Sequence, residues 1–152
     1  CCTTPLYDAM GMTLTGMHKQ VQGMKDALVV VTIITDGMEN ASREYNGQTI
    51  KELVERLRGE GWTFTYMGAN QESVEVAMSM SIRNARNFDY SNEGTRASMQ
   101  KDSSTRMNLF GRLANWKTAE MKGCCAIPAS ESERRNLYAN MADEAFDEEE
   151  NK

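Results

Sequence analysis

The stretch from Leu28 to Thr35 constrains the fold more than any other part of the chain. It reads LVVVTIIT, so β-branched residues fill most positions and apolar side chains point to both faces of an extended segment. A strand that is apolar on both faces is typical of the centre of a parallel sheet covered by helices on each side. Asp36-Gly37 follows at once and is expected to end the strand. This stretch therefore predicts an α/β fold.

The neighbouring segments predict alternating helices and strands. Apolar residues recur every three or four positions from Leu6 to Leu28, which indicates a helix with one buried face. Thr4-Pro5 precedes it, and we expect the threonine to cap the first turn and the proline to occupy the first helical position. A capping box at 49–52 and the glycines at 59 and 61 delimit a second helix. A strand over 62–67, a helix over 74–82 and a short strand near 87–90 are expected to follow.

This order predicts right-handed βαβ units. The expected fold is a Rossmann-like, doubly wound, mainly parallel sheet with flanking helices. After Gly94 the composition changes, and the acidic residues gather near the end of the chain. We therefore expect residues 1–93 to form the α/β domain and residues 94–152 a mostly helical, acidic and partly flexible C-terminal extension.

Charge and cysteine content narrow the classes of function. The chain has 17 basic and 22 acidic residues, a formal net charge of −5, which argues against nucleic-acid binding. No apolar run approaches the roughly 20 residues of a membrane span, so membrane association is not expected. The four cysteines form two adjacent pairs, Cys1-Cys2 and Cys124-Cys125, and neither pair has the spacing of a zinc site. Reduced thiols and a cytoplasmic location are the expectation.

Asp36 is the best single candidate for a functional residue. Ligands of parallel α/β sheets bind beyond the carboxyl ends of the strands, and Asp36 holds that position after the most apolar strand. The alternative is that Asp36-Gly37 only forms a turn. Glu39, Asn40 and Ser42 follow in a polar loop, where they either line a site or are solvated.

Several short motifs resemble the second half of a von Willebrand factor A domain, in the small intracellular bacterial and phage versions. The motifs are Thr4-Pro5-Leu6-Tyr7-Asp8-Ala9, Thr35-Asp36-Gly37, Gly61-Trp62-Thr63-Phe64 and Gly68-Ala69-Asn70-Gln71, in the order that the family has. The resemblance covers about residues 3 to 90. It implies a metal-ion-dependent adhesion site, which the family builds from an Asp-x-Ser-x-Ser loop, a threonine and an aspartate. Thr4 and Asp36 match the last two.

The resemblance also implies the chemistry of this site. Mg²⁺ prefers oxygen ligands in octahedral geometry and leaves a position for a carboxylate from a protein partner. Thr4 would supply its hydroxyl, with Thr3 as the fallback, and Asp36 would hold a metal-bound water. No Asp-x-Ser-x-Ser precedes Thr4 and the first strands of the family's sheet are absent. We therefore expect Mg²⁺ binding to be weak or absent in this chain alone.

The leading hypothesis is a protein-interaction module of the von Willebrand A type with an incomplete metal site and no catalytic activity. Its partner would be a protein, through an acidic residue that completes the metal site. Without the first strand, the Leu28–Ile34 strand would present an apolar edge, so self-association is a further expectation, as is a chain that belongs to a longer protein. The alternatives are a Mg²⁺-dependent α/β phosphohydrolase-like enzyme and a fragment without independent function.

Overall fold

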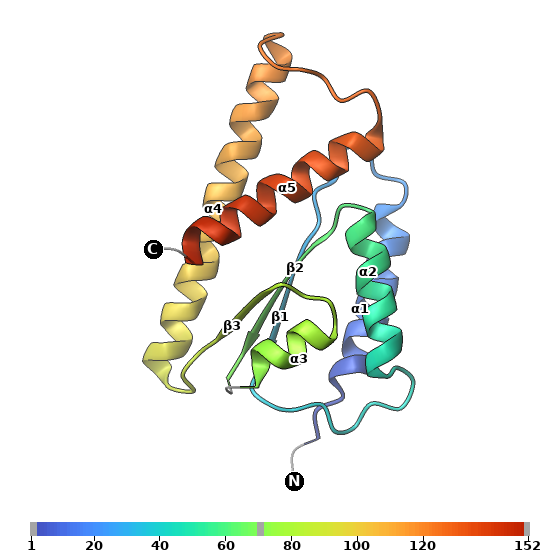
Figure 1. Cartoon of the computed structure of the whole chain (residues 1–152), viewed down its shortest axis with the longest axis vertical. Coiled ribbons are helices and arrows are strands. Elements are labelled where there is room, and N and C mark those ends of the chain that lie inside the picture. The colour runs from blue at the N-terminus through green and yellow to red at the C-terminus, as the bar shows by residue number, and fades with distance from the viewer. Residues whose placement is uncertain (1–2, 70–71, 151–152) are drawn as a thin grey trace.

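The structure is a computed structural model that describes residues 3–69 and 72–150 (Figure 1). Its elements are, in chain order, α1 (Leu6–Val21), β1 (Val30–Thr35), α2 (Gly47–Gly59), β2 (Thr63–Gly68), α3 (Ser73–Ser79), β3 (Asn84–Asn87), α4 (Asn92–Met121) and α5 (Glu131–Glu150). The predicted α/β class is confirmed, because three parallel strands carry helices on both faces. Asn70 and Gln71, which belong to one of the motifs above, lie outside the described residues.

The sheet has the strand order β1-β2-β3, and both pairings are parallel. Val30 lies opposite Thr63, and Thr65 lies opposite Asn84. All six residues of β2 are buried. Within the described residues, β2 is the central strand and β1 lies at an edge. The central position that the apolar pattern of Leu28–Thr35 suggested is therefore not observed, whereas the free edge expected in the absence of the family's first strand is. Helices cover both faces of β1, which explains its apolar pattern.

Two helical layers sandwich the sheet (Figure 1). α1 and α2 cover one face and form the larger core; its most deeply buried members include Leu14, Ile50, Val54, Leu57, Phe64, Tyr66, Met80 and Ile82. α4 and α5 cover the other face, where Leu109 and Ala142 pack with Leu28 and Val30. Burial of these apolar surfaces is the main force that holds the layers together.

Polar groups on α4 also contact the sheet. Thr32 and Thr65 bring their hydroxyl oxygens within 2.8 Å of each other on the α4 side of the sheet. Arg106 donates to the Thr32 hydroxyl and is paired at 2.8 Å with Asp102, one turn earlier on α4. Part of the contact between α4 and the sheet is therefore made by hydrogen bonds instead of an apolar stripe.

Asp26 ties the segment before β1 to the two C-terminal helices. Its carboxylate accepts hydrogen bonds from the Tyr138 hydroxyl of α5 and from the Lys117 ammonium of α4, the latter at 2.6 Å. Burial alone would raise the pKa of Asp26, but these two bonds and the nearby charge of Arg134 lower it below its ordinary value. The ionised carboxylate thus links three parts of the fold.

The helix starts differ from those expected. α1 begins at Leu6 with Pro5 in the N-cap position and has no side-chain cap, so Thr4 does not cap it. α2 begins at Gly47, where Asn46 and Thr49 form a reciprocal capping box three residues before the predicted one. Among the described residues, none of the helices is both long and apolar enough to cross a membrane.

Candidate binding surface along the first strand

Thr4 and Asp36 line one pocket at the carboxyl end of β1. The pocket has a volume of about 440 Å³, and its remaining lining is Pro5, Leu6, Ala9, Ile34, Thr35, Phe88, Tyr90 and Thr95. The Tyr90 hydroxyl donates to Asp36 Oδ2 at 3.2 Å. The fold therefore brings the two sequence-predicted residues together in a mostly apolar pocket with one carboxylate. Thr3 is exposed and does not line it.

The approach of Thr4 to the strand end depends on Gly37. A Cβ atom at Gly37 would lie 2.7 Å from Thr4 Oγ1, closer than such atoms pack. The Thr35 hydroxyl donates to the Gly37 carbonyl at 2.9 Å, which fixes the turn at the end of β1. Asp36-Gly37 therefore forms the bend at the end of β1, and Asp36 also lines the pocket; its role as a functional residue stays a prediction.

Glu39 anchors the loop that follows. Its carboxylate accepts hydrogen bonds from the backbone N–H groups of Tyr7, Ala41 and Ser42 and from the Ser42 hydroxyl, over 2.6–2.9 Å. Partial burial would raise the pKa of Glu39, but these hydrogen bonds outweigh that effect and lower the pKa to about 2. Glu39 thereby also satisfies an amide in the first turn of α1, where Thr4 was expected to act.

Two more side chains join the same loop to α1. Asp8 accepts hydrogen bonds from the backbone N–H groups of residues 43, 44 and 45 at 2.8–2.9 Å, and these bonds lower its pKa. Asn40 Oδ1 accepts from the Thr4 N–H at 2.8 Å, and the Asn40 N–H donates to the Thr4 carbonyl at 3.3 Å. Glu39, Asn40 and Ser42 thus organise the loop beside the pocket.

The residues at this pocket do not by themselves fit a Mg²⁺ site. Thr4 and Asp36 offer one hydroxyl and one carboxylate, whereas Mg²⁺ needs near-octahedral oxygen coordination. Within residues 3–69 and 72–150, no cluster of three or more His, Cys, Asp or Glu side chains is placed to hold a metal ion. Metal binding here would require further donors.

The outer edge of β1 has unpaired backbone groups. Thr63 donates to the Val29 carbonyl at 3.0 Å and Ala69 to the Thr35 carbonyl at 3.1 Å, so the odd-numbered residues of β1 face β2. Alternate residues of a parallel ladder bond to opposite sides. Val30, Thr32 and Ile34 therefore direct their N–H and C=O groups away from β2, and none of these groups has a partner among the described residues.

An apolar groove runs along this edge, between β1 and α1. It has a volume of about 220 Å³, and it shares Leu6, Ala9 and Ile34 with the Asp36 pocket, so the two are continuous. Ile34 is 46% exposed. We call the free edge of β1, this groove and the Asp36 pocket the β1 surface.

The neighbouring flank of α1 carries no charge. Residues 9–17 include no charged side chain, and Met12 and Met17 are exposed. The apolar repeat from Leu6 to Leu28 predicts that Met10, Met17 and Met24 are buried, but only Met10 is; Met17 and Met24 are exposed. This charge-free run is the sequence signal that could have revealed the exposed flank.

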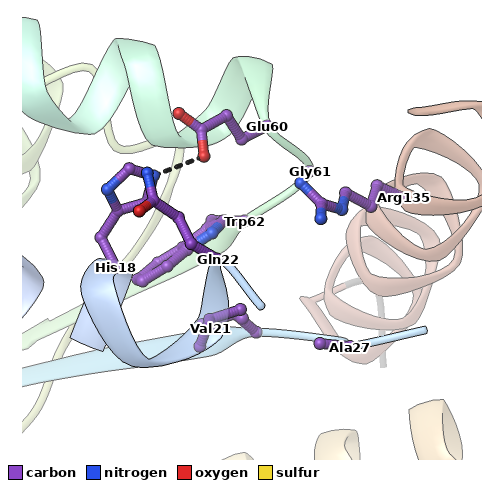
Figure 2. Close-up of a pocket in the computed structure, with 9 residues that line it drawn as sticks. His18, Val21, Gln22, Ala27, Glu60, Gly61, Trp62 and Arg135 are labelled. Carbon is purple, nitrogen blue, oxygen red and sulfur yellow. Dashed lines mark hydrogen bonds and ion pairs between the residues drawn. The ribbon is translucent and has the colours of Figure 1, made fainter. Parts of the chain in front are cut away.

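His18 belongs to a different pocket, at the opposite end of the sheet (Figure 2). Its Nε2 lies 2.7 Å from Glu60 Oε2, and its ring packs against Trp62 with the centroids 6.2 Å apart. Figure 2 shows the Arg135 guanidinium entering the pocket from α5. The His18 side chain is 17% exposed, so it is partly buried at this pocket.

Three kinds of comparison bear on identity. Comparisons with models of protein families, with curated proteins and with solved structures found no match. The resemblance to von Willebrand A domains stays a prediction from the motifs in the sequence.

Proposed function

We propose that this protein is a non-enzymatic, von Willebrand A-like interaction module that binds an extended segment of a protein partner along the β1 surface. The observation that carries the proposal is the free edge of β1. Natural edge strands are usually protected by charges, prolines, bulges or a covering element. Val30–Thr35 contains no charge and no proline, and an apolar groove lies beside it.

The chemistry of this surface matches a peptide in strand conformation. Only an extended chain presents N–H and C=O groups at the two-residue spacing of Val30, Thr32 and Ile34. Alternate side chains of the added strand would enter the groove between β1 and α1. The strand would end at the pocket, where Asp36 can accept a hydrogen bond from a donor group of the partner.

The metal-dependent form of this proposal needs additional ligands. An acidic partner residue would be repelled by Asp36 unless Mg²⁺ lay between them, and the two donors described here are too few to hold the ion. In the absence of further donors, the partner group at the pocket is an amide, a hydroxyl or a basic side chain. We further propose a cytoplasmic protein, because Cys124 and Cys125 are free thiols in a fold that needs no disulfide among its described residues.

Amide hydrogen exchange followed by NMR tests the geometry of the edge. In the free protein, we expect the amides of Val30, Thr32 and Ile34 to exchange much faster than those of Val31 and Ile33, which face β2. Uniform protection of all five amides in a monomer would contradict a free edge. Uniform protection together with a dimer mass by light scattering would make a second copy the occupant.

A displayed library of random 12-residue peptides tests the binding itself. Peptides selected on the wild-type protein should alternate apolar residues and should protect the amides of Thr32 and Ile34. Ile34→Lys places a charge on the edge and should abolish their binding, while Met107→Lys, an exposed position on α4, should leave it unchanged. Absence of enrichment, or peptides that bind both variants equally, would refute the proposal.

A further inference from the structure

A second polar pocket lies at the amino-terminal end of the sheet, opposite the Asp36 pocket. It has a volume of about 390 Å³, within the range of small-molecule sites. Its apolar part comes from Trp62, Phe64 and Ile82, each no more than 5% exposed. Unlike the β1 surface, this pocket is lined mainly by polar and charged side chains.

One wall of this pocket is a polar stripe of α5. Asn136, Asn140 and Asp143 follow one another at helical spacing and line the pocket with Ala139 between them. The same helix buries Tyr138 and Phe146 elsewhere. All three side chains are exposed, so this wall of the pocket is polar and open to solvent.

The charged groups in the pocket are of both signs and do not pair directly. Arg58, near the end of α2, donates to the Ser81 carbonyl at 2.8 Å, and Arg83 precedes β3. Desolvation raises the pKa of Asp143 and outweighs a hydrogen bond from Asn84 and the charges of the two arginines, which lower it. No ion pair within 4 Å joins either arginine to Asp143 in the described part of the chain. The opposite charges therefore face a shared space.

Thr63 contributes an independent observation. Thr63 is 3% exposed and lines the pocket, and its hydroxyl has no hydrogen-bond partner among residues 3–69 and 72–150. Buried hydroxyls in folded proteins are nearly always hydrogen-bonded, since an unsatisfied one costs about 1–3 kcal/mol. A ligand group that reached this oxygen would supply the missing partner.

We propose that this pocket binds a small zwitterion of the free α-amino-acid type. Its carboxylate would lie toward Arg58 and Arg83 and its ammonium group toward Asp143. A bare anion would meet the Asp143 carboxylate, and a bare cation would meet two guanidinium groups, so only a ligand with both charges satisfies the whole pocket. The Thr63 hydroxyl and the asparagine amides supply further hydrogen bonds.

The probes for the test are the free L-amino acids, applied one at a time to the full chain. Binding is followed by calorimetry and by ligand-observed NMR, with acetate, ethylamine and inorganic phosphate as singly functional controls. We expect at least one amino acid to bind with one-to-one stoichiometry and about tenfold more tightly than acetate or ethylamine.

Variants locate the site. Asp143→Asn and Arg83→Gln should each weaken binding about tenfold, and Thr63→Val, which keeps the side-chain volume, should weaken it several-fold. Glu75→Gln, on exposed α3 surface, is the matched control and should bind like the wild type. Circular dichroism and the unfolding midpoint confirm that each variant folds.

Three outcomes would overturn the proposal. The first is that no amino acid binds at millimolar concentration. The second is equal binding to all four variants, which would place the site elsewhere. The third is binding of phosphate alone that becomes tighter in Asp143→Asn, which would make the pocket an anion site. Each result is independent of peptide binding at the β1 surface.

Discussion

Replacing Glu39 by glutamine should destabilise the protein in a pH-dependent way. The difference between the ordinary pKa of 4.5 and about 2 corresponds to roughly 3 kcal/mol of preferential stabilisation of the carboxylate in the folded state. Because this loop is partly open to solvent, screening reduces the expected loss in Glu39→Gln to about 1–2 kcal/mol at pH 7. For a chain of this size, that loss lowers the melting temperature by about 2–8 °C.

The sign of the pH dependence follows from the lowered pKa. The stabilisation is present above pH 4.5, where the unfolded chain is also ionised, and is lost as the pH falls from 4.5 toward 2. Urea unfolding of wild type and Glu39→Gln between pH 7 and pH 3 measures this directly. The difference in the free energy of unfolding should shrink by roughly half or more by about pH 3.

Glu44→Gln is the matched control for this experiment. Glu44 lies in the same loop and is exposed, and its side chain makes no hydrogen bond to the described residues. Its replacement should change stability by less than about 0.5 kcal/mol at any pH. If Glu39→Gln behaves like Glu44→Gln at pH 7, or if the difference does not depend on pH, the argument that Glu39 anchors the loop is refuted.

Three further predictions concern packing, a buried hydroxyl and metal binding. Gly11→Ala would place a methyl group 2.4 Å from the Tyr45 ring, so it should lower the free energy of unfolding, measured with urea, by about 1–3 kcal/mol. Gly16 has open space around it, so Gly16→Ala should raise the free energy of unfolding by up to about 1 kcal/mol. Tyr138→Phe removes the hydroxyl that donates to the Asp26 carboxylate and should lower the free energy of unfolding by about 1–3 kcal/mol. An unchanged melting temperature would contradict this prediction. Titration with Mg²⁺ or Mn²⁺, by calorimetry and thermal shift, should give no saturable stabilisation. Saturable stabilisation lost in both Thr4→Ala and Asp36→Ala would show that other donors complete the site.

The sequence predicts the local elements well because their signals are local. The β-branched run of β1 and the apolar repeat of α2 identify a strand and a helix within a few residues of their observed ends. The apolar pattern of β1 reports helices above and below and not the number of neighbouring strands. Its position at the edge is expected only from the resemblance, because the family's first strand is absent. α4 gives a weak signal because two of its three buried residues, Asp102 and Thr105, are polar.

The candidate sites differ in how far they could be predicted. Asp36 is identified by its place after a strand, and the fold brings Thr4 to the same pocket. The loop anchors are harder to predict, because Glu39 bonds to an amide 32 positions away, and no local pattern marks such a contact. For the pocket at the amino-terminal end of the sheet, the sequence offers one signal, which is the helical spacing of Asn136, Asn140 and Asp143.

The anchored loop beside Asp36 has a consequence for binding rates and affinity. Because Glu39 and Asp8 already hold the loop through backbone amides, a partner that docks there does not have to order it, and the conformational entropy cost of association falls mainly on the partner. These anchors are hydrogen bonds to uncharged groups, so added salt should leave the loop in place. The surface is preorganised, and differences in affinity among partners should therefore reflect how easily each adopts an extended conformation.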